Sequence, residues 1–378
     1  MDDYFESLGI PAEAAEARRL VATCSDVMQV RTARWVDQEL GDLVGRPMPS
    51  GDPALELRGR LLVDSDRAFD WLSERLATLG YVAMLREDKA DHVVIALPGS
   101  LPKSGGRTLT ALALFGATLL SVLWVGAEYD SVPGKGFNLL AGVPFAASLL
   151  GILLAHEMGH YLMARWQRIP ATLPYFIPMP LSLLGTMGAV IQTRAPSRNR
   201  RALLLLGASG PIAGLVVAIP VLFVGLSSSE LGRITPGTFQ EGNSILYALA
   251  KLAVFGRFLP SAGVDVYINS VALAGWAGLL VTGMNLIPAG QLDGGHIAYA
   301  LFGRRAKYLT WGVVGALVAL SLAWQGWMLW AFLVLFMGRV HAVPLDDVTP
   351  LRPGERLLAA LSLVLLLLVF IPVPMVFN

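Results

Sequence analysis

Two histidines and a glutamate stand close together near the middle of the chain, in the pentapeptide His156-Glu157-Met158-Gly159-His160. On a helix, residues four apart lie on the same face, one turn from each other. Both imidazoles can therefore reach one metal ion, with the glutamate beside it, as in a zinc hydrolase. Residues 141–155, directly before this motif, contain no charged side chain. Ionisable groups in so apolar a helix are costly, and this makes them candidates for function.

A catalytic zinc ion usually takes three protein ligands and leaves one position for water. The histidines outside the pentapeptide are His92, His296 and His341. The first falls in a hydrophilic region and the last in a polar loop, so a carboxylate is the better third ligand. Asp293 is the only acid in residues 266–345. Because an isolated acid in apolar sequence needs a cation, Asp293 is our candidate.

The composition indicates an integral membrane protein. Of 378 residues, 54% are hydrophobic and 15% are charged, and the mean hydropathy is +0.58. The net charge of +1 argues against nucleic acid as a partner, since no excess of lysine and arginine exists to neutralise phosphates. The single cysteine, Cys24, excludes an internal disulfide. The acidic start, residues 1–6, has no basic region before an apolar one, so we expect no cleaved secretory signal and a cytoplasmic N-terminus.

Three parts are expected along the chain: a soluble α+β domain over residues 1–100, a linker over 101–108 and a transmembrane domain over 109–378. The first part holds much of the charge and no long apolar run. Its expected elements are a helix over 11–19, a strand over 55–63, a helix over 64–79 and a hairpin over 81–97. We infer a folded cytoplasmic domain whose role the residues leave open.

Seven apolar segments follow, measured against the 20 or so apolar residues that a bilayer-spanning helix needs. They cover residues 109–127, 139–165, 202–226, 268–286, 309–324, 327–337 and 357–376. The fifth and sixth are short, so the expected fold is an all-α membrane protein, a polytopic bundle of about six to seven transmembrane segments with the small α+β domain in front.

The loops that carry most of the arginines alternate along this series. All of them fall on one side if every segment crosses, and the positive-inside rule makes that side cytoplasmic. The pentapeptide and Asp293 then both lie at the cytoplasmic ends of their segments. We expect a bacterial cytoplasmic membrane, with an organellar membrane as the alternative.

Together these motifs resemble the site-2 protease family of intramembrane zinc metalloproteases. The resemblance is carried by the pentapeptide, by the downstream motif of Asn285, Pro288, Leu292, Asp293 and Gly294, and by the glycine and proline run over residues 207–214. It covers roughly residues 139–303. The loop over residues 227–267 is too short for a PDZ module, so the chain is similar to a PDZ-less branch with an N-terminal soluble extension.

The resemblance implies a role for each matched residue. Zn²⁺ would be bound by His156, His160 and Asp293, with Glu157 as the general base. Asn285 would hydrogen-bond the substrate or the developing oxyanion, although a polar contact between helices is the open alternative. His296 is either a partner of the ligands or a packing residue.

The implied activity is hydrolysis of peptide bonds in or near transmembrane segments of single-pass membrane proteins, within the lipid bilayer. Residues 185–193 are expected to be extended and either pair with an unwound substrate or form a plain loop. An inactive membrane scaffold or chaperone and a metal transporter are the alternatives. The first should have lost a ligand or the base, and the second should carry more ionisable residues along its spans. The oligomeric state is left open.

Overall fold

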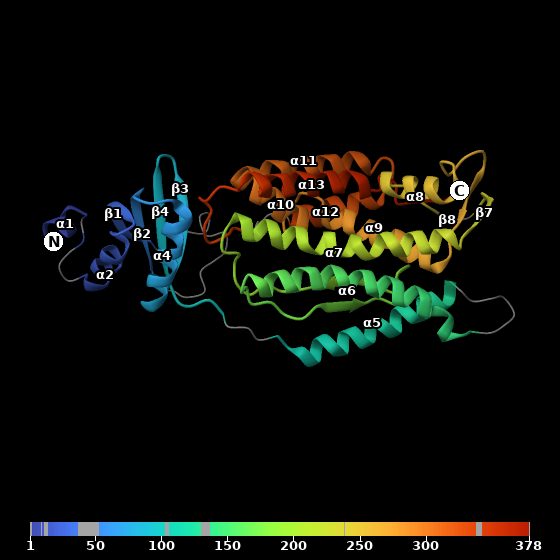
Figure 1. Ribbon diagram of the computed structural model, residues 1–378, viewed down its shortest axis with the longest axis horizontal. Coiled ribbons are helices and arrows are strands. Elements are labelled where there is room, and N and C mark those ends of the chain that lie inside the picture. Colours follow the sequence, from blue (N-terminus) through green and yellow to red (C-terminus); the bar gives the residue numbers. More distant parts are fainter. Residues whose placement is uncertain are drawn as a thin grey trace.

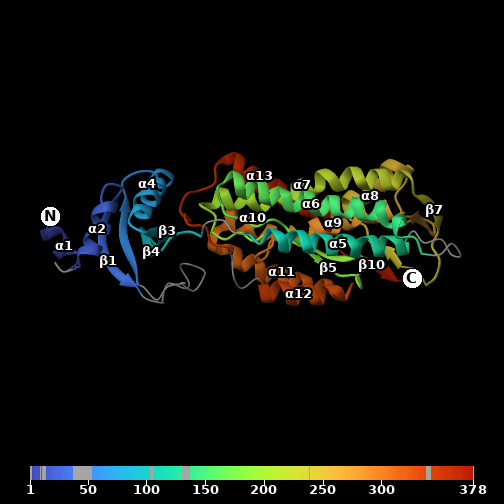
Figure 2. The ribbon, with the colours of Figure 1, turned by 90° about the horizontal axis from the view of Figure 1, so that it is seen from below.

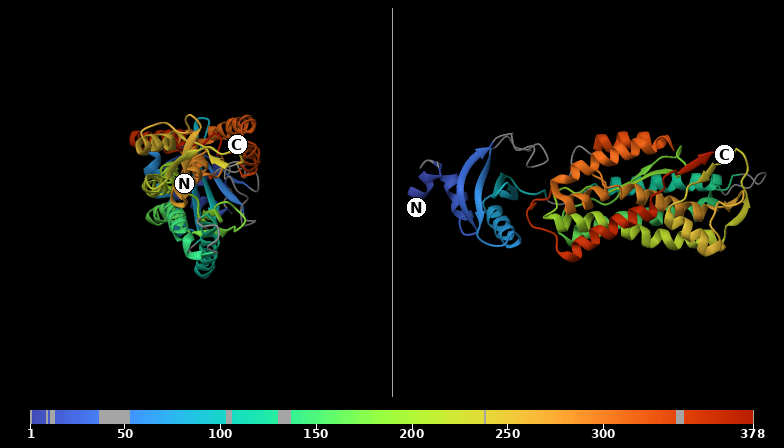
Figure 3. Two further views of the ribbon diagram at one scale, coloured as in Figure 1. Left: turned by 90° about the vertical axis from the view of Figure 1, so that its right-hand side faces the viewer. Right: turned by 90° about the horizontal axis from the view of Figure 1, so that it is seen from above.

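Two parts of different composition lie end to end in the computed structural model, a small domain with a sheet and a longer, mostly helical bundle (Figure 1). The structure describes residues 2–8, 10, 14–36, 53–102, 106–129, 137–237, 239–337 and 342–377. The view from above shows the same order, with the N-terminal domain at one end and the last strand at the other (Figure 3, right).

The N-terminal domain is an antiparallel sheet covered by helices. Its elements are α1 (Asp2–Ser7), α2 (Ala15–Cys24), β1 (Met28–Val36), β2 (Ala54–Leu61), α4 (Ser65–Thr78), β3 (Tyr81–Asp88) and β4 (Asp91–Pro98). The strand order is β1-β2-β4-β3, so β3 is an edge strand of this sheet. Leu20, Leu72 and Ile95 are among the buried side chains of its core. The expected strand over 55–63, helix over 64–79 and hairpin over 81–97 are confirmed to within a few residues.

Two features of this domain differ from expectation. The helix expected over residues 11–19 begins at Ala15 and continues to Cys24, while residues 11–13 lie outside the described part. The strand β1 was not predicted because its arginines make it look like a polar segment. Arg34 in fact extends from β1 to the buried Glu56 of β2, with Nε 2.8 Å from Oε1. The expected domain limits at residues 100 and 108 stay predictions.

The bundle consists of helices of very different length. They are α5 (Thr108–Tyr129), a 3-10 turn (Leu139–Gly142), α6 (Val143–Trp166), α7 (Arg200–Ser227), α8 (Ile245–Phe255), α9 (Ser270–Asn285), α10 (Asp293–Phe302), a second 3-10 turn (Gly303–Arg305), α11 (Ala306–Leu320), α12 (Gly326–Met337) and α13 (Pro353–Val369). Within the described residues, three helices are long and apolar enough to cross a membrane: α5, α6 with its preceding turn, and α7. The expected six to seven crossings stay a prediction.

The last expected span, residues 357–376, is wrong at its end. Helix α13 stops at Val369, and Pro372 and Pro374 follow, which cannot continue a helix. Beyond them, β10 (Met375–Phe377) pairs with β8 (Phe239–Glu241). The segment is apolar because it packs into the bundle, not because it extends the helix.

Helix α7 lies against α6, α9 and α10 and so holds the middle of the bundle (Figures 1 and 2). Small residues make this close approach possible. A Cβ at Gly159 of α6 would come within 2.5 Å of the Ser209 carbonyl on α7. A Cβ at Gly275 of α9 would come within 2.6 Å of Leu222 Cα on α7. Close helix packing through small residues is the usual solution where lipid gives no hydrophobic drive to association.

Short strand pairs complete the bundle. Strand β5 (Tyr175–Pro178) pairs antiparallel with β6 (Thr186–Val190), so the extended conformation expected over residues 185–193 is confirmed for its larger part. Strands β7 (Glu230–Arg233) and β9 (Val264–Tyr267) pair at the end opposite to the N-terminal domain (Figure 1).

Candidate metal centre

The structure brings the three candidate ligands together from two helices that are distant in sequence. On α6, His156 and His160 are 3% and 7% exposed, and their Nε2 atoms lie 3.3 Å apart. Asp293 is the first residue of α10, and its Oδ2 lies 3.2 Å from Nε2 of each histidine. Three donor atoms of the kinds that zinc prefers therefore converge on one point.

The position of Asp293 depends on the turn that joins α9 to α10. Helix α9 ends at Asn285, and Gly290 adopts a left-handed φ of +55°, which favours glycine. A Cβ at Gly294 would overlap the Leu286 carbonyl, and one at Gly295 would overlap the Gly290 carbonyl. The glycines after Asp293 thus let the turn fold back tightly on the start of α10, where an acid also suits the helix dipole.

Helix α7 closes the site from a third side. The His160 Nδ1 lies 2.8 Å from the Leu206 carbonyl oxygen. Because a carbonyl only accepts hydrogen bonds, Nδ1 donates the proton, so in the neutral form of the ring the lone pair of Nε2 is available for a metal ion. A Cβ at Gly210 would overlap this Nε2, and one at Gly214 would lie 3.1 Å from His156 Nδ1. The three converging ligand atoms, with the room that glycine leaves for the imidazole rings, fit a bound cation.

The other two candidate residues lie beside the ligands. Glu157 is 6% exposed, and its carboxyl group has a hydrogen-bonding partner in the backbone of Ile191, directly after β6. Asn285 lies at the end of α9 with its Nδ2 3.3 Å from His156 Nε2. All five candidate residues are therefore at one place, next to the β5–β6 pair.

Two other histidines, His92 and His296, belong to the described residues. On α10, His296 lies three residues after Asp293, with its Cβ against Gly207 of α7. In the sheet of the N-terminal domain, His92 Nδ1 accepts a hydrogen bond from the Leu61 N–H at 3.5 Å. His341 lies outside the described residues. The backbone groups of Leu206 and Ile191 were not predicted, because main-chain atoms leave no signature in a sequence.

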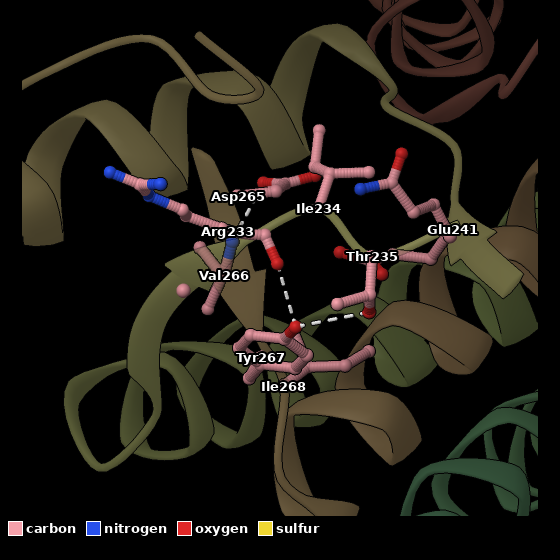
Figure 4. A pocket seen from close by; sticks show the side chains of 10 residues that line it. Arg233, Ile234, Thr235, Glu241, Asp265, Val266, Tyr267 and Ile268 are labelled. Atoms are coloured by element: carbon pink, nitrogen blue, oxygen red, sulfur yellow. Dashed lines mark hydrogen bonds between the residues drawn. The ribbon is translucent and has the colours of Figure 1, made fainter. Parts of the chain in front are cut away.

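A cavity of about 170 Å³ opens at the far end of the bundle. Its lining residues are Gly232, Arg233, Ile234, Thr235, Gln240, Glu241, Asp265, Val266, Tyr267 and Ile268. The hydroxyl of Tyr267 donates a hydrogen bond to the Arg233 carbonyl at 2.7 Å (Figure 4). None of the five candidate residues lines this cavity, so it is separate from the metal centre.

The part of the sequence that contains the metal centre also matches a known protein family. A model of peptidase family M50 matches residues 144–323, which include both histidines of the pentapeptide, Glu157 and Asp293. Over this stretch, slightly less than half of its length, the chain is similar to peptidase family M50, the site-2 protease family. The resemblance inferred from the motifs is confirmed. The match to family M50 runs from α6 to just beyond the end of α11, so the N-terminal domain, α12 and α13 lie outside it.

Several curated proteins are similar to this chain. The probable zinc metalloprotease EGY1, chloroplastic, of Arabidopsis thaliana is 33% identical over 244 residues, covering 62% of this chain and 43% of the relative. The probable zinc metalloprotease EGY2, chloroplastic, of the same plant is 32% identical over 242 residues, covering 63% and 43%. The chain thus spans less than half the length of these M50 relatives. No solved structure matches it.

Proposed function

We propose that this chain is an intramembrane zinc metalloprotease of the HExxH type, which hydrolyses peptide bonds in or near transmembrane segments of membrane proteins. The observation that carries the proposal is the convergence of His156, His160 and Asp293 within 3.2–3.3 Å of one another, with Glu157 beside them. The pentapeptide stands on a helix that is long and apolar enough to cross a membrane. The zinc metalloprotease names of the relatives support zinc as the metal.

The histidines would hold Zn²⁺ through Nε2 and Asp293 through Oδ2. When bound, the ion supplies Lewis-acid polarisation of the peptide carbonyl and of the attacking water. The remaining chemistry belongs to the protein. The Glu157 carboxylate accepts the proton of the attacking water and delivers a proton to the leaving amide nitrogen. The Asn285 amide donates a hydrogen bond to the oxygen that becomes negative in the transition state.

A peptide must be extended before it can be cut, and the β5–β6 pair offers a place for this. Strand β6 leads directly into Ile191, whose backbone faces the Glu157 carboxyl group. We propose that an unwound segment of a single-pass membrane protein pairs with this strand by β-augmentation. Main-chain hydrogen bonds would then hold the substrate beside the metal centre whatever its side chains are.

The membrane arrangement is also part of the proposal. With six to seven crossings, the basic loops, the N-terminal domain and the metal centre share the cytoplasmic side of a bacterial membrane, or the equivalent side of an organellar one. The two relatives named above are chloroplastic by name, which supports the organellar alternative.

The test compares the wild type with Glu157→Gln in detergent and in lipid vesicles, measuring zinc content and cleavage of a panel of transmembrane reporters. We expect both proteins to hold one zinc per chain and only the wild type to cleave, because glutamine keeps the shape but accepts no proton. Equal cleavage by both proteins would overturn the mechanism. Stoichiometric zinc without cleavage of any reporter would favour a membrane scaffold. Uptake of zinc into vesicles that contain the protein would favour a transporter.

A further inference from the structure

A short segment before α13 joins the N-terminal domain to the bundle. Residues 345–347 lie between the two parts, in the red-orange coil that leads to α13 (Figure 1). On one side the segment extends the sheet at β3: the Leu85 N–H donates to the Leu345 carbonyl at 2.9 Å, and the Asp347 N–H donates to the Leu85 carbonyl at 3.1 Å. The edge strand of the N-terminal sheet is therefore bridged to a short segment contributed by the bundle.

The same segment is bonded on its other side to the start of α7. The Leu345 N–H donates to the Ser197 carbonyl at 2.9 Å, and the Asp346 N–H donates to the Arg198 carbonyl at 2.8 Å. Backbone hydrogen bonds in one continuous ladder thus connect β3 with the residues that lead into α7. We call residues 345–347, with the groups bonded to them, the joint.

The Asp347 side chain ties two helices of the bundle to the joint. Its Oδ1 accepts a hydrogen bond from Arg200 Nε at 2.9 Å, and its Oδ2 accepts one from the Tyr299 hydroxyl at 3.0 Å. Arg200 is the first residue of α7, and Tyr299 lies on α10. Asp347 is 7% exposed, so solvent screens the charge of its carboxylate only weakly.

From the N-terminal domain, Arg86 enters the same cluster. It is fully buried, and its Nη1 donates to the carbonyls of Leu85 and Leu345 at 2.8 and 2.7 Å. Burial lowers the pKa of Arg86, and the negative charge of Asp347 opposes this shift most strongly. By contrast, the Arg352–Asp66 pair between domain and bundle is exposed and 3.8 Å long, so it contributes little. The Arg198–Asp70 ion pair between the same two parts is likewise exposed, so the buried cluster is better shielded from solvent than either ion pair.

Both helices held by Asp347 run directly to the metal centre. Leu206, whose carbonyl orients His160, lies six positions after Arg200 on the helix, a rise of about 9 Å. Six residues also separate Tyr299 from Asp293. The relative position of α7 and α10 fixes how Asp293 meets the histidines, since a Cβ at Gly207 of α7 would already lie 2.9 Å from the Asp293 carbonyl.

We propose that Asp347 is a positioning residue, through which the N-terminal domain holds α7 and α10 in the relative placement that the metal centre needs. The inference rests on the proposed zinc protease function, and it assigns the N-terminal domain a role in that function. Loosening the domain at Arg86 should change the site without any contact between the domain and the ligands. A partner that binds the domain and strains β3 would then act on the enzyme through the same residues.

The test is Asp347→Asn in the full chain, which removes the charge but keeps the backbone ladder. Two quantities are measured: the rate at which a chelator extracts zinc, and kcat and KM on a cleaved reporter. We expect zinc loss to be about 10-fold faster and kcat about 10-fold lower with KM little changed, since small displacements of positioned groups have effects of this size or larger. Tyr299→Phe, which removes one hydroxyl, should change both in the same direction but less.

Asp265→Asn is the matched control. Asp265 also has a buried carboxylate in an ion pair, with 7% side-chain exposure against 5% for Asp347, but it lies at the far end of the bundle. We expect its zinc loss and kcat to stay within about twofold of the wild type even if its melting temperature falls, because the site is distant. Arg86→Met should resemble Asp347→Asn, and Arg86→Lys should restore part of the loss.

Equal zinc loss and equal kcat in Asp347→Asn and Asp265→Asn would overturn the role of the joint. If Arg86→Met has wild-type zinc loss and kcat while Asp347→Asn is defective in both, the proposed role of the N-terminal domain would be wrong. If the wild type retains zinc but cleaves no reporter, the proposed function fails, and faster zinc loss from Asp347→Asn would still support the joint.

Discussion

Two clusters of buried charged groups occupy opposite halves of the bundle, and they differ in one respect. At the far end, the fully buried Lys251 places its Nζ 3.0 Å from Asp265 Oδ1 and 3.1 Å from Glu241 Oε1. The Tyr247 hydroxyl adds a hydrogen bond of 2.8 Å to Glu241. In the metal centre, Asp293 faces two imidazole nitrogens, the atoms through which histidines bind a metal.

The comparison shows how a structural cluster can be told from a site. A buried carboxylate is stable when a cation and hydrogen bonds meet it. The Lys251 cluster contains its own cation and is complete as the chain folds. The metal centre has three converging metal-binding atoms, and Gly210 makes room for the His160 ring among them, so a cation from outside would complete it. Burial and charge alone would not have separated the two.

The strongest way to break this comparison is to remove one carboxylate from each cluster. Asp293→Ala should abolish zinc binding and cleavage, because two histidines alone hold zinc weakly. Asp265→Ala should leave both within about twofold of the wild type while lowering stability. Zinc content by atomic absorption and reporter cleavage measure the difference. Cleavage that survives in Asp293→Ala would mean that the metal centre is not the site of catalysis.

Asn285→Ala tests the neutral group that touches the ligands. If the amide stabilises the oxyanion, kcat should fall by about 100-fold or more with unchanged zinc content, as for other donors of this kind. If the amide is a contact between helices, kcat per folded molecule should be nearly normal and the melting temperature lower. Steady-state kinetics beside a thermal melt in the same detergent separates the two, which the sequence left open.

Gly210→Ala asks whether the space beside His160 is what distinguishes the metal centre. A methyl group there would overlap His160 Nε2, so the ring must turn away, and we expect zinc affinity to fall by about 10- to 100-fold, as for changes in groups that orient a ligand. Gly151→Ala on α6 is the control, since a Cβ there meets nothing within 4 Å. Zinc affinity is measured by competition with a chelating dye. Similar affinities in the two variants would contradict the role of Gly210 in making room for the His160 ring.

The sequence revealed those parts of the site that lie in residue types at fixed spacing. The i, i+4 histidines determine their own geometry on a helix, and the isolation of Asp293 in apolar sequence marked it as a partner. The orientation of His160 depends on the carbonyl of Leu206, and any residue at that position would supply the same atom. The family match supports the resemblance to the site-2 protease family, whereas the motif's chemistry and the roles of single residues are for the variants above to test.

The fold, like the site, was predictable where it depends on local residue patterns and not where it depends on main-chain contacts. Apolar runs located the long helices α5, α6 and α7, but α8 was missed because eleven residues are too few for a span. The segment at residues 345–347 appeared as a polar loop between apolar segments. It is bridged to the edge strand β3, about 260 residues earlier, and pairing over such a distance has no local pattern.

Lys251→Met should have the smallest effect on cleavage. It leaves Asp265 and Glu241 buried without their cation, so stability should fall by about 3–5 kcal/mol. Zinc content and kcat per folded molecule should stay near wild-type values, because the far end of the bundle holds no ligand. Melting temperature, zinc content and cleavage are measured on one preparation. A loss of zinc as large as that in Asp293→Ala would show that the two clusters are coupled, and the distinction between a self-completed cluster and a metal centre would then fail for this bundle.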